Sequence, residues 1–186
     1  MTKLAAPILG DGIRAEPMTE AHRAALRSAC AEDPDIWAIY STDFGPAAFD
    51  ASFDKIMGLP WVRFVLFDDA DEMVGMSSFL NIEAERHLLE IGNTFYRPRV
   101  RGTGVNRRVK DMLMKRAFAC GFTRIEYRVD LRNLRSQAAM AKLGAVREGV
   151  MRQDRTTWTG HRRDTVLFSI LANEWPGADD RLAAGR

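Results

Sequence analysis

Two spacings of apolar residues divide the first half of the chain into strands and helices. Short apolar runs predict strands over residues 12–18, 61–67, 73–82 and 87–96, and the acidic turn 68–72 joins two of them into a hairpin. Helices are expected over residues 20–30, with Thr19 as the cap, and over residues 46–59, with Pro46 near the start. This half therefore combines consecutive strands with two helices.

The second half begins with a helical period after Pro98. Apolar residues recur at helical spacing between Gly104 and Cys120, which predicts a helix that Gly121 ends. Further elements are expected to follow: a strand at 123–130, a helix at 133–144 capped by Asn133, and paired strands at 146–153 and 165–171. The central unit is a strand, a glycine turn, a helix and a strand in succession.

Length and composition predict one domain. A chain of 186 residues with 46% apolar content can bury a single core, so we expect one domain over residues 1–186, with flexible ends at 1–10 and 176–186. The sequence contains neither a long apolar run nor a secretory signal, which predicts a cytoplasmic protein without a membrane partner. Cys30 and Cys120 predict neither a disulfide framework nor a structural metal.

The net charge of +2 hides an asymmetry between the two halves. Residues 1–90 contain 7 Lys/Arg and 16 Asp/Glu, whereas residues 91–186 contain 20 and 9. We expect the acidic half to favour cations and the basic half to favour anions. A nucleic-acid-binding module is more often basic overall, so this balance argues against a nucleic-acid partner.

The stretch YRPRVRGTGVNRRVK, residues 96–110, surrounds two glycines with basic side chains. Gly102 and Gly104 allow backbone N–H groups to approach a ligand, and they lead into a helix N-terminus, which favours anions. With Arg97, Arg99 and Arg101 nearby, the arrangement suits a pyrophosphate. A plain turn and a solvated basic surface remain alternatives, whereas the spacing fits neither a P-loop nor a dinucleotide fingerprint.

Three segments resemble the GCN5-related N-acetyltransferases, the GNAT family, and within it the ribosomal-protein N-terminal acetyltransferases of the RimJ and RimL branch. They are EIGNTFYRPRVRGTGVN, VDLRNLRSQAAMAKLGAVREGVMR and GHRRDTVLFSILANEW, which lie in order between about residues 88 and 175. The resemblance implies an α/β (α+β) GNAT fold in a single domain, with a mixed, mostly antiparallel sheet of about seven strands flanked by helices. It also implies an acyltransferase that moves an acetyl group from acetyl-CoA to an amine.

The resemblance assigns the acetyl-CoA site residue by residue. The residues implied to bind the cofactor are Arg99, Val100, Arg101, Gly102, Thr103 and Gly104 through the turn, Asn106 after it, and Asn133 at the pantetheine arm. Asn133 also suits a helix cap, and both roles can hold together. Ser136 is placed near the sulfur end.

Acetyl transfer requires positioning, an N–H donor for the developing oxyanion and an acceptor for the amine proton. The resemblance places the donor around residues 93–95. Glu90 is the candidate base, since alternation puts it on one face with Gly92 and Thr94, although a structural carboxylate explains it equally well. The chain departs from its relatives at Met140, where many have a tyrosine acid, and at Arg155, where some have a glutamate. Ser136 or water would then have to assist the leaving thiolate.

The acceptor is less defined than the acetyl donor. Trp37 and Tyr40 lie where relatives build the substrate wall, and a role as core aromatics is the alternative; Asn93 is a further candidate contact. A small-molecule amine and a peptide or protein amine both fit, and the acidic first half favours a cationic one. The sequence leaves open a homodimer and two rival functions, a noncatalytic acyl-CoA sensor and a basic RNA-binding module.

Overall fold

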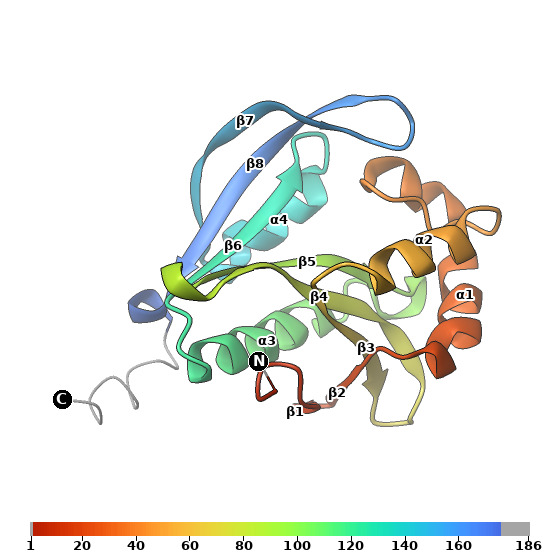
Figure 1. The fold of residues 1–186 in the computed structure, drawn as a ribbon, viewed down its shortest axis with the longest axis horizontal. Helices are drawn as coiled ribbons and strands as arrows, with labels where there is room; N and C mark the ends of the chain where they lie inside the picture. The colour runs from red at the N-terminus through yellow and green to blue at the C-terminus, as the bar shows by residue number, and fades with distance from the viewer. Residues whose placement is uncertain (1, 176–186) are drawn as a thin grey trace.

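The computed structural model describes residues 2–175. Within these residues a single sheet has eight strands, arranged in the order β1-β2-β3-β4-β5-β6-β8-β7 (Figure 1). The strands are β1 (Ile8–Gly10), β2 (Ile13–Pro17), β3 (Val62–Asp68), β4 (Met73–Glu83), β5 (Leu88–Tyr96), β6 (Arg124–Asp130), β7 (Val146–Thr156) and β8 (Arg162–Leu171). Neighbouring strands are antiparallel except β5 and β6, which are parallel. The mixed, mostly antiparallel sheet is thus confirmed, with β1 added to the expected strands.

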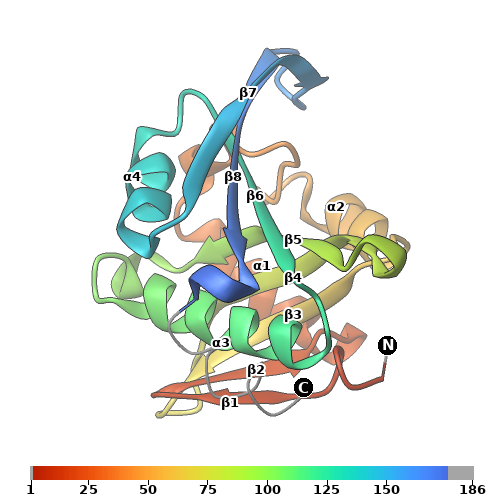
Figure 2. The ribbon, with the colours of Figure 1, turned by 90° about the vertical axis from the view of Figure 1, so that its left-hand side faces the viewer.

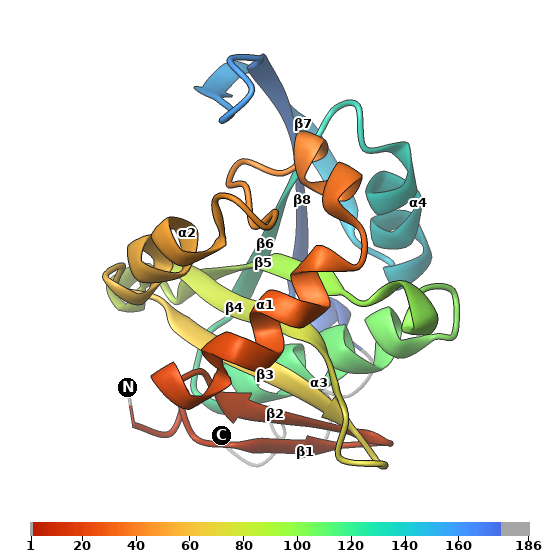
Figure 3. The same cartoon turned by 90° about the vertical axis from the view of Figure 1, so that its right-hand side faces the viewer.

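Helices cover both faces of the sheet. They are α1 (Arg23–Ala31), α2 (Phe49–Met57), α3 (Val105–Ala119) and α4 (Leu134–Leu143). Helices α3 and α4 lie on one face (Figure 2), and α1 and α2 lie on the other (Figure 3). Helix α2 starts at Phe49, later than predicted, because Ala48 is its N-cap and Pro46 lies in the preceding turn. Within residues 2–175, no helix is both long and apolar enough to cross a bilayer.

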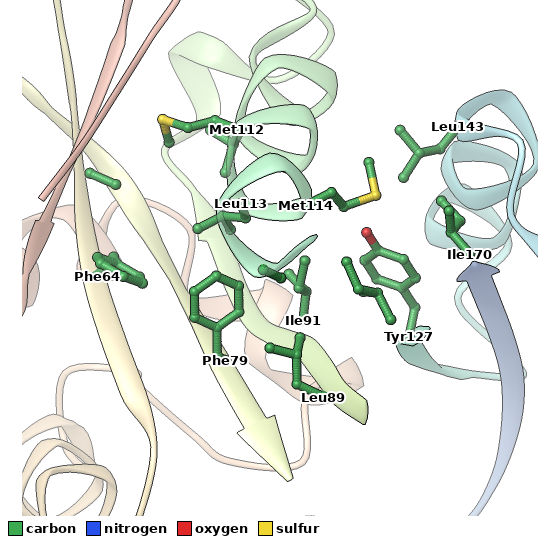
Figure 4. Packing of buried hydrophobic residues seen from close by; sticks show 14 of the residues in the cluster. Phe64, Phe79, Leu89, Ile91, Met112, Leu113, Met114, Tyr127, Leu143 and Ile170 are labelled. Carbon is green, nitrogen blue, oxygen red and sulfur yellow. The ribbon is translucent and has the colours of Figure 1, made fainter. Parts of the chain in front are cut away.

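Each face of the sheet has its own apolar core. On the α3 face, Phe64, Phe79 and Ile91 of the sheet pack against Leu113 and Met114 of the helix (Figure 4). On the α1 and α2 face, the buried cluster is largely aromatic and comprises Trp37, Phe44, Phe49, Phe53 and Phe95 with aliphatic neighbours. Burial of each such side chain contributes roughly 1.5–3 kcal/mol. The sheet is therefore held rigidly from both sides.

The N-terminal segment packs against α3. Leu4 is 2% exposed, and Arg116 of α3 donates hydrogen bonds to the carbonyl oxygens of Lys3, Ala6 and Pro7. This packing differs from the flexible end expected for residues 1–10. The other expected flexible end, 176–186, lies outside the described residues.

Strands β5 and β6 pair over only part of their length. Their register covers Leu88 to Glu90, opposite Arg124 to Glu126. Beyond this point β5 continues beside β4, and β6 continues beside β8, so the two halves of the sheet diverge (Figure 1). The sheet thus opens at the strand that precedes the glycine turn.

Candidate active site

A cleft of about 850 Å³ lies at the divergence of β5 and β6. It is lined by β4, β5, β6, α3 and α4, by the segment between α1 and α2, and by the β7–β8 hairpin. The lining residues include Tyr40, Ser41, Asn81, Glu90, Gly92, Asn93, Thr94, Tyr96, Val100, Arg101, Gly102, Gly104, Asn106, Lys110, Tyr127, Arg128, Asp130, Asn133, Ser136, Met140, Arg155 and Arg163. The cleft brings together most of the site residues predicted from the sequence.

A β-bulge shapes the β5 wall of the cleft. Met76 of β4 pairs with Phe95, whereas Ser78 pairs with Gly92, so a two-residue step on β4 faces a three-residue step on β5. Asn93 absorbs the extra residue in a left-handed conformation, with φ at 47°. Bulges of this kind re-aim side chains and interrupt pairing, which they do here beside the cleft.

The bulge also changes which side chains of β5 share a face of the sheet. Ile91 packs on the α3 face, so Glu90 and Gly92 alternate to the opposite face, as predicted. Thr94 was expected to share that face, but its Oγ1 accepts a hydrogen bond from Lys110 Nζ of α3 at 2.9 Å. The expectation was wrong for Thr94 because the extra residue at Asn93 reverses the alternation.

Glu90 lies almost entirely buried in the cleft wall, with 7% of its surface exposed. Its Oε2 accepts a hydrogen bond from Asn81 Nδ2 at 2.7 Å and lies 3.5 Å from Arg128 Nε. Burial raises the pKa of Glu90, while the charges of Arg128 and Arg155 and the hydrogen bond from Asn81 oppose the rise. A carboxylate with a raised pKa is a better proton acceptor than an exposed one.

Lys110 is a cleft residue that the sequence analysis did not identify. Only 4% of its surface is exposed, and its Nζ lies 5.2 Å from the centre of the Tyr127 ring. Burial lowers the pKa of Lys110 to about 7, despite the opposing charge of Glu90. Near neutral pH a large fraction of this amine is therefore uncharged.

A sequence signal for Lys110 does exist. Leu113 and Met114 are both buried, and they lie three and four positions from Lys110. Residues at this spacing share a helix face, so Lys110 interrupts an apolar stripe. A lysine in such a stripe must either reach water at a helix end or enter a polar cavity. Here it enters the cleft.

The glycine turn forms an open surface at the start of α3. Gly102 and Gly104 have φ of 82° and 85°, values that glycine adopts without strain. A Cβ added at either position would meet nothing within 4 Å. Gly104 is the N-cap of α3 and offers no side chain, so the first N–H groups of the helix are left to water or an anion. The geometry suits the phosphates of a cofactor.

The arginines beside the turn are held by carboxylates: Arg97 pairs with Glu32, Arg99 with Asp68 and Glu72, and Arg101 with Asp33. Val100 and Arg101 still contribute to the cleft wall. The Arg99 side chain points to its ion pairs, and Thr103 Oγ1 donates to the Val100 carbonyl at 2.7 Å. Neither Arg99 nor Thr103 is among the described residues that line the cleft.

Helix α4 supplies the wall opposite β5. Asn133 is its N-cap, and the Asn133 side-chain oxygen accepts a hydrogen bond from Ser136 N at 2.9 Å, which confirms the predicted cap. Asn133, Ser136 and Met140 all line the cleft, although Met140 itself is 3% exposed. The hydroxyl that this wall offers at the cleft is therefore that of Ser136, not a tyrosine at 140.

The two aromatic residues proposed for the acceptor wall, Trp37 and Tyr40, differ in position: Tyr40 lines the cleft and Trp37 does not. Trp37 is fully buried, donates through Nε1 to the Cys30 carbonyl at 3.1 Å and packs on Phe95 with ring centres 4.9 Å apart. It is a core residue, the alternative that the sequence left open, and it does not line the cleft. Tyr40 does line the cleft, and its hydroxyl donates to the Thr94 carbonyl at 2.8 Å. Tyr40, from the segment between α1 and α2, therefore holds the bulged part of β5 in place through this hydrogen bond.

The acidic excess of residues 1–90 does not reach the cleft. Its carboxylates mostly pair with arginines: Glu20, Asp50 and Asp54 with Arg23, and others with Arg14, Arg27, Arg86, Arg97, Arg99 and, at the cleft wall, Arg101. Among the described residues of that half, Glu90 is the carboxylate that lines the cleft. The expectation that the acidic half attracts a cationic acceptor therefore lacks a structural basis.

Several polar atoms in the cleft lack partners, and they test whether a cofactor fits. Among residues 2–175, Asn93 Nδ2, Tyr96 Oη and Tyr127 Oη are buried without a hydrogen bond. All three residues line the cleft. Unpaired buried polar groups are costly, so they favour a ligand with donors and acceptors along its length. An amide-rich arm that ends in phosphates at α3 meets this requirement.

Comparisons with known proteins agree with this geometry. Residues 13–146 match the acetyltransferase (GNAT) domain. A protein from T. thermophilus described as an acetyltransferase is 34% identical, with a TM-score of 0.83 and coverage of 96% of this chain and 95% of that one. A GCN5-related N-acetyltransferase from Brucella melitensis is 25% identical, with a TM-score of 0.84 and coverage of 96% and 84%.

A more distant structure shares the fold alone. The ribosomal L7/L12 α-N-protein acetyltransferase RimL, solved with coenzyme A, is 19% identical, with a TM-score of 0.76 and coverage of 91% of this chain and 99% of that one. No curated protein sequence matches the chain. The match to the acetyltransferase (GNAT) domain covers most of the chain, and the T. thermophilus structure is similar in sequence and in fold over 96% of it. The chain therefore belongs to the GNAT family of acetyltransferases.

Proposed function

We propose that this protein is an acetyl-CoA-dependent N-acetyltransferase acting on a primary amine in a ternary complex. The observation that carries the proposal is the cleft at the divergence of β5 and β6, which joins the open N-terminus of α3 to the buried carboxylate of Glu90. The first end suits phosphates and the second suits an amine. Membership of the GNAT family implies acyl-CoA binding, and acetyl-CoA is the acyl donor that we propose.

The residues proposed to hold the cofactor lie along one path through the cleft. The N–H groups at Gly102, Gly104 and the first turn of α3 would take the pyrophosphate, with Asn106 on the same turn. Asn133, besides capping α4, and Tyr127 offer polar atoms to the pantetheine arm. When bound, acetyl-CoA supplies an acetyl thioester.

The transfer needs an N–H donor and a proton acceptor from the protein. The amine forms the N–C bond, the C–S bond breaks, and the thiol departs with one proton, so the balance requires no oxidant or reductant. The bulge at Asn93 turns β5 out of its ladder next to the cleft, which makes backbone N–H groups of residues 93–95 the proposed donors. Glu90 is the proposed base, acting directly or through one water.

The acid that protonates the leaving thiolate has fewer candidates. Met140 cannot donate a proton, and Arg155 cannot replace a carboxylate. Ser136 lies in the α4 wall and is the proposed donor together with water. Thiols have an ordinary pKa near 8.5, so this step requires little assistance at neutral pH.

We propose an α-amine as the acceptor, possessed by an amino acid or by a peptide or protein N-terminus. The α-amino group of a peptide or protein N-terminus, with a pKa of about 7.7–8.0, is roughly a tenth to a sixth uncharged at pH 7, whereas a lysine is almost wholly protonated. A site whose proton acceptors are Glu90 and water therefore favours α-amines. We place the protein in the cytoplasm, in keeping with the free thiols of Cys30 and Cys120.

Release of free thiol from acetyl-CoA tests the proposal in a screen of amino acids, peptides and polyamines. We expect release that depends on an α-amine and an acetylated product found by mass spectrometry. Binding of acetyl-CoA without turnover of any amine would favour the noncatalytic sensor. A salt-sensitive shift of RNA that acetyl-CoA does not compete would favour the RNA-binding module.

A further inference from the structure

The cleft is basic at the end where the acceptor would enter. Arg128 of β6, Arg155 of β7 and Arg163 of β8 all line it near Glu90. Their mutual influence shows that they are close: Arg128 and Arg155 both lower the pKa of Glu90, and Arg155 lowers the pKa of Arg163. These arginines do not belong to the phosphate end, which is built by the turn and α3.

Two of these arginines have a carboxylate partner besides Glu90: Arg128 Nη2 donates to Glu126 Oε2 at 3.2 Å, and Arg155 pairs with Asp154. Asp130 accepts hydrogen bonds from Arg132, through Nη2 at 2.8 Å and Nε at 3.0 Å. Asp154 pairs with Arg155 at 2.7 Å and accepts from Thr165 at 2.9 Å. Arg163, by contrast, donates no hydrogen bond to a carboxylate among the described residues, and the Asp130 carboxylate lies 3.9 Å from its Nε.

Arg163 is a buried arginine with an unused hydrogen-bond donor. It is 6% exposed, and its two terminal nitrogens donate to Ser41 Oγ at 2.9 Å and to the Arg128 carbonyl at 3.0 Å. Its Nε has no hydrogen-bond partner within residues 2–175, and the Asp130 carboxylate is 3.9 Å away. A buried guanidinium with an unused donor is costly unless an anion completes it.

Arg128 links this position to the catalytic end. Its Nε is also buried without a hydrogen bond and lies 3.5 Å from Glu90 Oε2, while its carbonyl accepts from Arg163. An anion bound between Arg128 and Arg163 would thus be close enough to Glu90 for the anion and an amine at Glu90 to belong to one small substrate, separated by a few covalent bonds. Guanidinium groups recognise carboxylates through paired N–H donors, so a carboxylate is the matching anion.

We propose that the acceptor carries a carboxylate close to its amine, and that Arg163 and Arg128 bind this carboxylate while the amine lies at Glu90. The inference rests on the proposed function and specifies its substrate class. Two sources supply this chemistry: the α-carboxylate of a free amino acid, and the acidic side chain of an N-terminal aspartate or glutamate in a peptide. A polyamine lacks the carboxylate and is disfavoured.

Matched acceptor pairs test the proposal by kcat/KM. One pair is a free amino acid and its carboxamide, and the other is a short peptide with N-terminal Glu and its Gln counterpart. We expect the carboxylate member of at least one pair to be preferred by roughly 10- to 100-fold, the range for a charge-assisted hydrogen bond to a buried group. The pair that shows the preference identifies the source.

Variants connect the preference to the arginines. Arg163→Gln should reduce the ratio of carboxylate to carboxamide toward one, mainly through KM, a change that general loss of structure would not produce. Arg162→Gln, at the neighbouring exposed position of β8, should leave the ratio unchanged. If Arg163→Gln does not fold, Arg128→Gln gives the same reading, because Arg128 contacts the same proposed anion.

Two results would overturn the inference, and they differ in meaning. Equal or faster acetylation of both carboxamides than of their carboxylate partners would refute the carboxylate while leaving the N-acetyltransferase intact. A preference that survives both arginine substitutions would place the recognition elsewhere. Absence of any acetylated amine would instead overturn the proposed function itself, and the inference with it.

Discussion

Replacement of Lys110 by methionine should change how stability depends on pH. The substitution removes the buried amine and keeps an unbranched side chain of similar length. Burial lowers the pKa of Lys110 from 10.5 to about 7, so between these values the unfolded chain binds a proton that the folded protein does not. Because the unfolded state binds more protons in this window, the free energy of unfolding of the wild type rises with pH across it.

The magnitude follows from the two pKa values. A change from 10.5 to about 7 corresponds to about 5 kcal/mol over the whole window, at 1.36 kcal/mol for each pKa unit. Integration of the same titration between about pH 7 and about pH 9.5 gives roughly 3 kcal/mol. The methionine variant has no such titration. Its stability relative to the wild type should therefore be greatest near pH 7 and decline by roughly 3 kcal/mol toward pH 9.5.

Urea unfolding of both proteins at several pH values measures this difference, in which other titrating groups cancel. Lys115→Met, on an exposed position of the same helix, is the matched control and should show a nearly constant difference. A difference for Lys110→Met that is equally flat would refute the reasoning. It would mean that the amine remains charged in the fold, through water in the cleft or through Glu90.

Three further predictions concern the site and its frame. Glu90→Gln should lower kcat by roughly 10- to 1000-fold and remove the acidic limb of its pH profile, because only the ionised carboxylate accepts a proton; near-native kcat with a lower melting temperature would make Glu90 structural. Trp37→Ala should cost about 3–5 kcal/mol in urea unfolding, as expected for a fully buried aromatic residue, and a change confined to the acceptor KM would contradict its core assignment. Arg124 and Ser169 lower the pKa of Glu148 to about 2, below its ordinary 4.5, so its stabilisation is present above pH 4.5 and lost toward pH 2. The stability deficit of Glu148→Gln should shrink over that range, and a constant deficit would show that the ion pair is not its cause.

Local signals in the sequence predicted the glycine turn and the starts of α3 and α4 well. Gly102 and Gly104 adopt the positive φ that their turn requires, and α3 begins at the next residue. Asn133 caps α4 as predicted, because an N-cap depends on residues three apart in the chain. Such features are decided within a few residues, so the sequence alone can predict them.

The part of the cleft that we propose binds the acceptor is shaped by contacts between residues that are distant in the sequence. The bulge at Asn93 has no counterpart in the apolar pattern, because Gly92, Asn93 and Thr94 contain no large apolar residue whose alternation it could interrupt. Arg163 acquires its burial from Ser41 and Arg128, which are far from it in sequence. Net charge likewise did not reveal which carboxylates reach the cleft, because ion pairs between residues distant in sequence neutralise most of the acidic half. The long-range pairing of charges therefore has to come from the fold.

Binding of acetyl-CoA to Gly104→Val tests the central claim most directly, by calorimetry beside the wild type and Gly121→Val. The two glycines flank α3, both have positive φ, and both offer open space to a Cβ, so the substitutions impose similar backbone strain at opposite ends of the helix. We expect the wild type and Gly121→Val to bind acetyl-CoA and folded Gly104→Val to lose at least about 10-fold in affinity, because its side chain obstructs the phosphates at the helix N-terminus. Equal affinity of all three folded proteins would contradict a cofactor site at the start of α3.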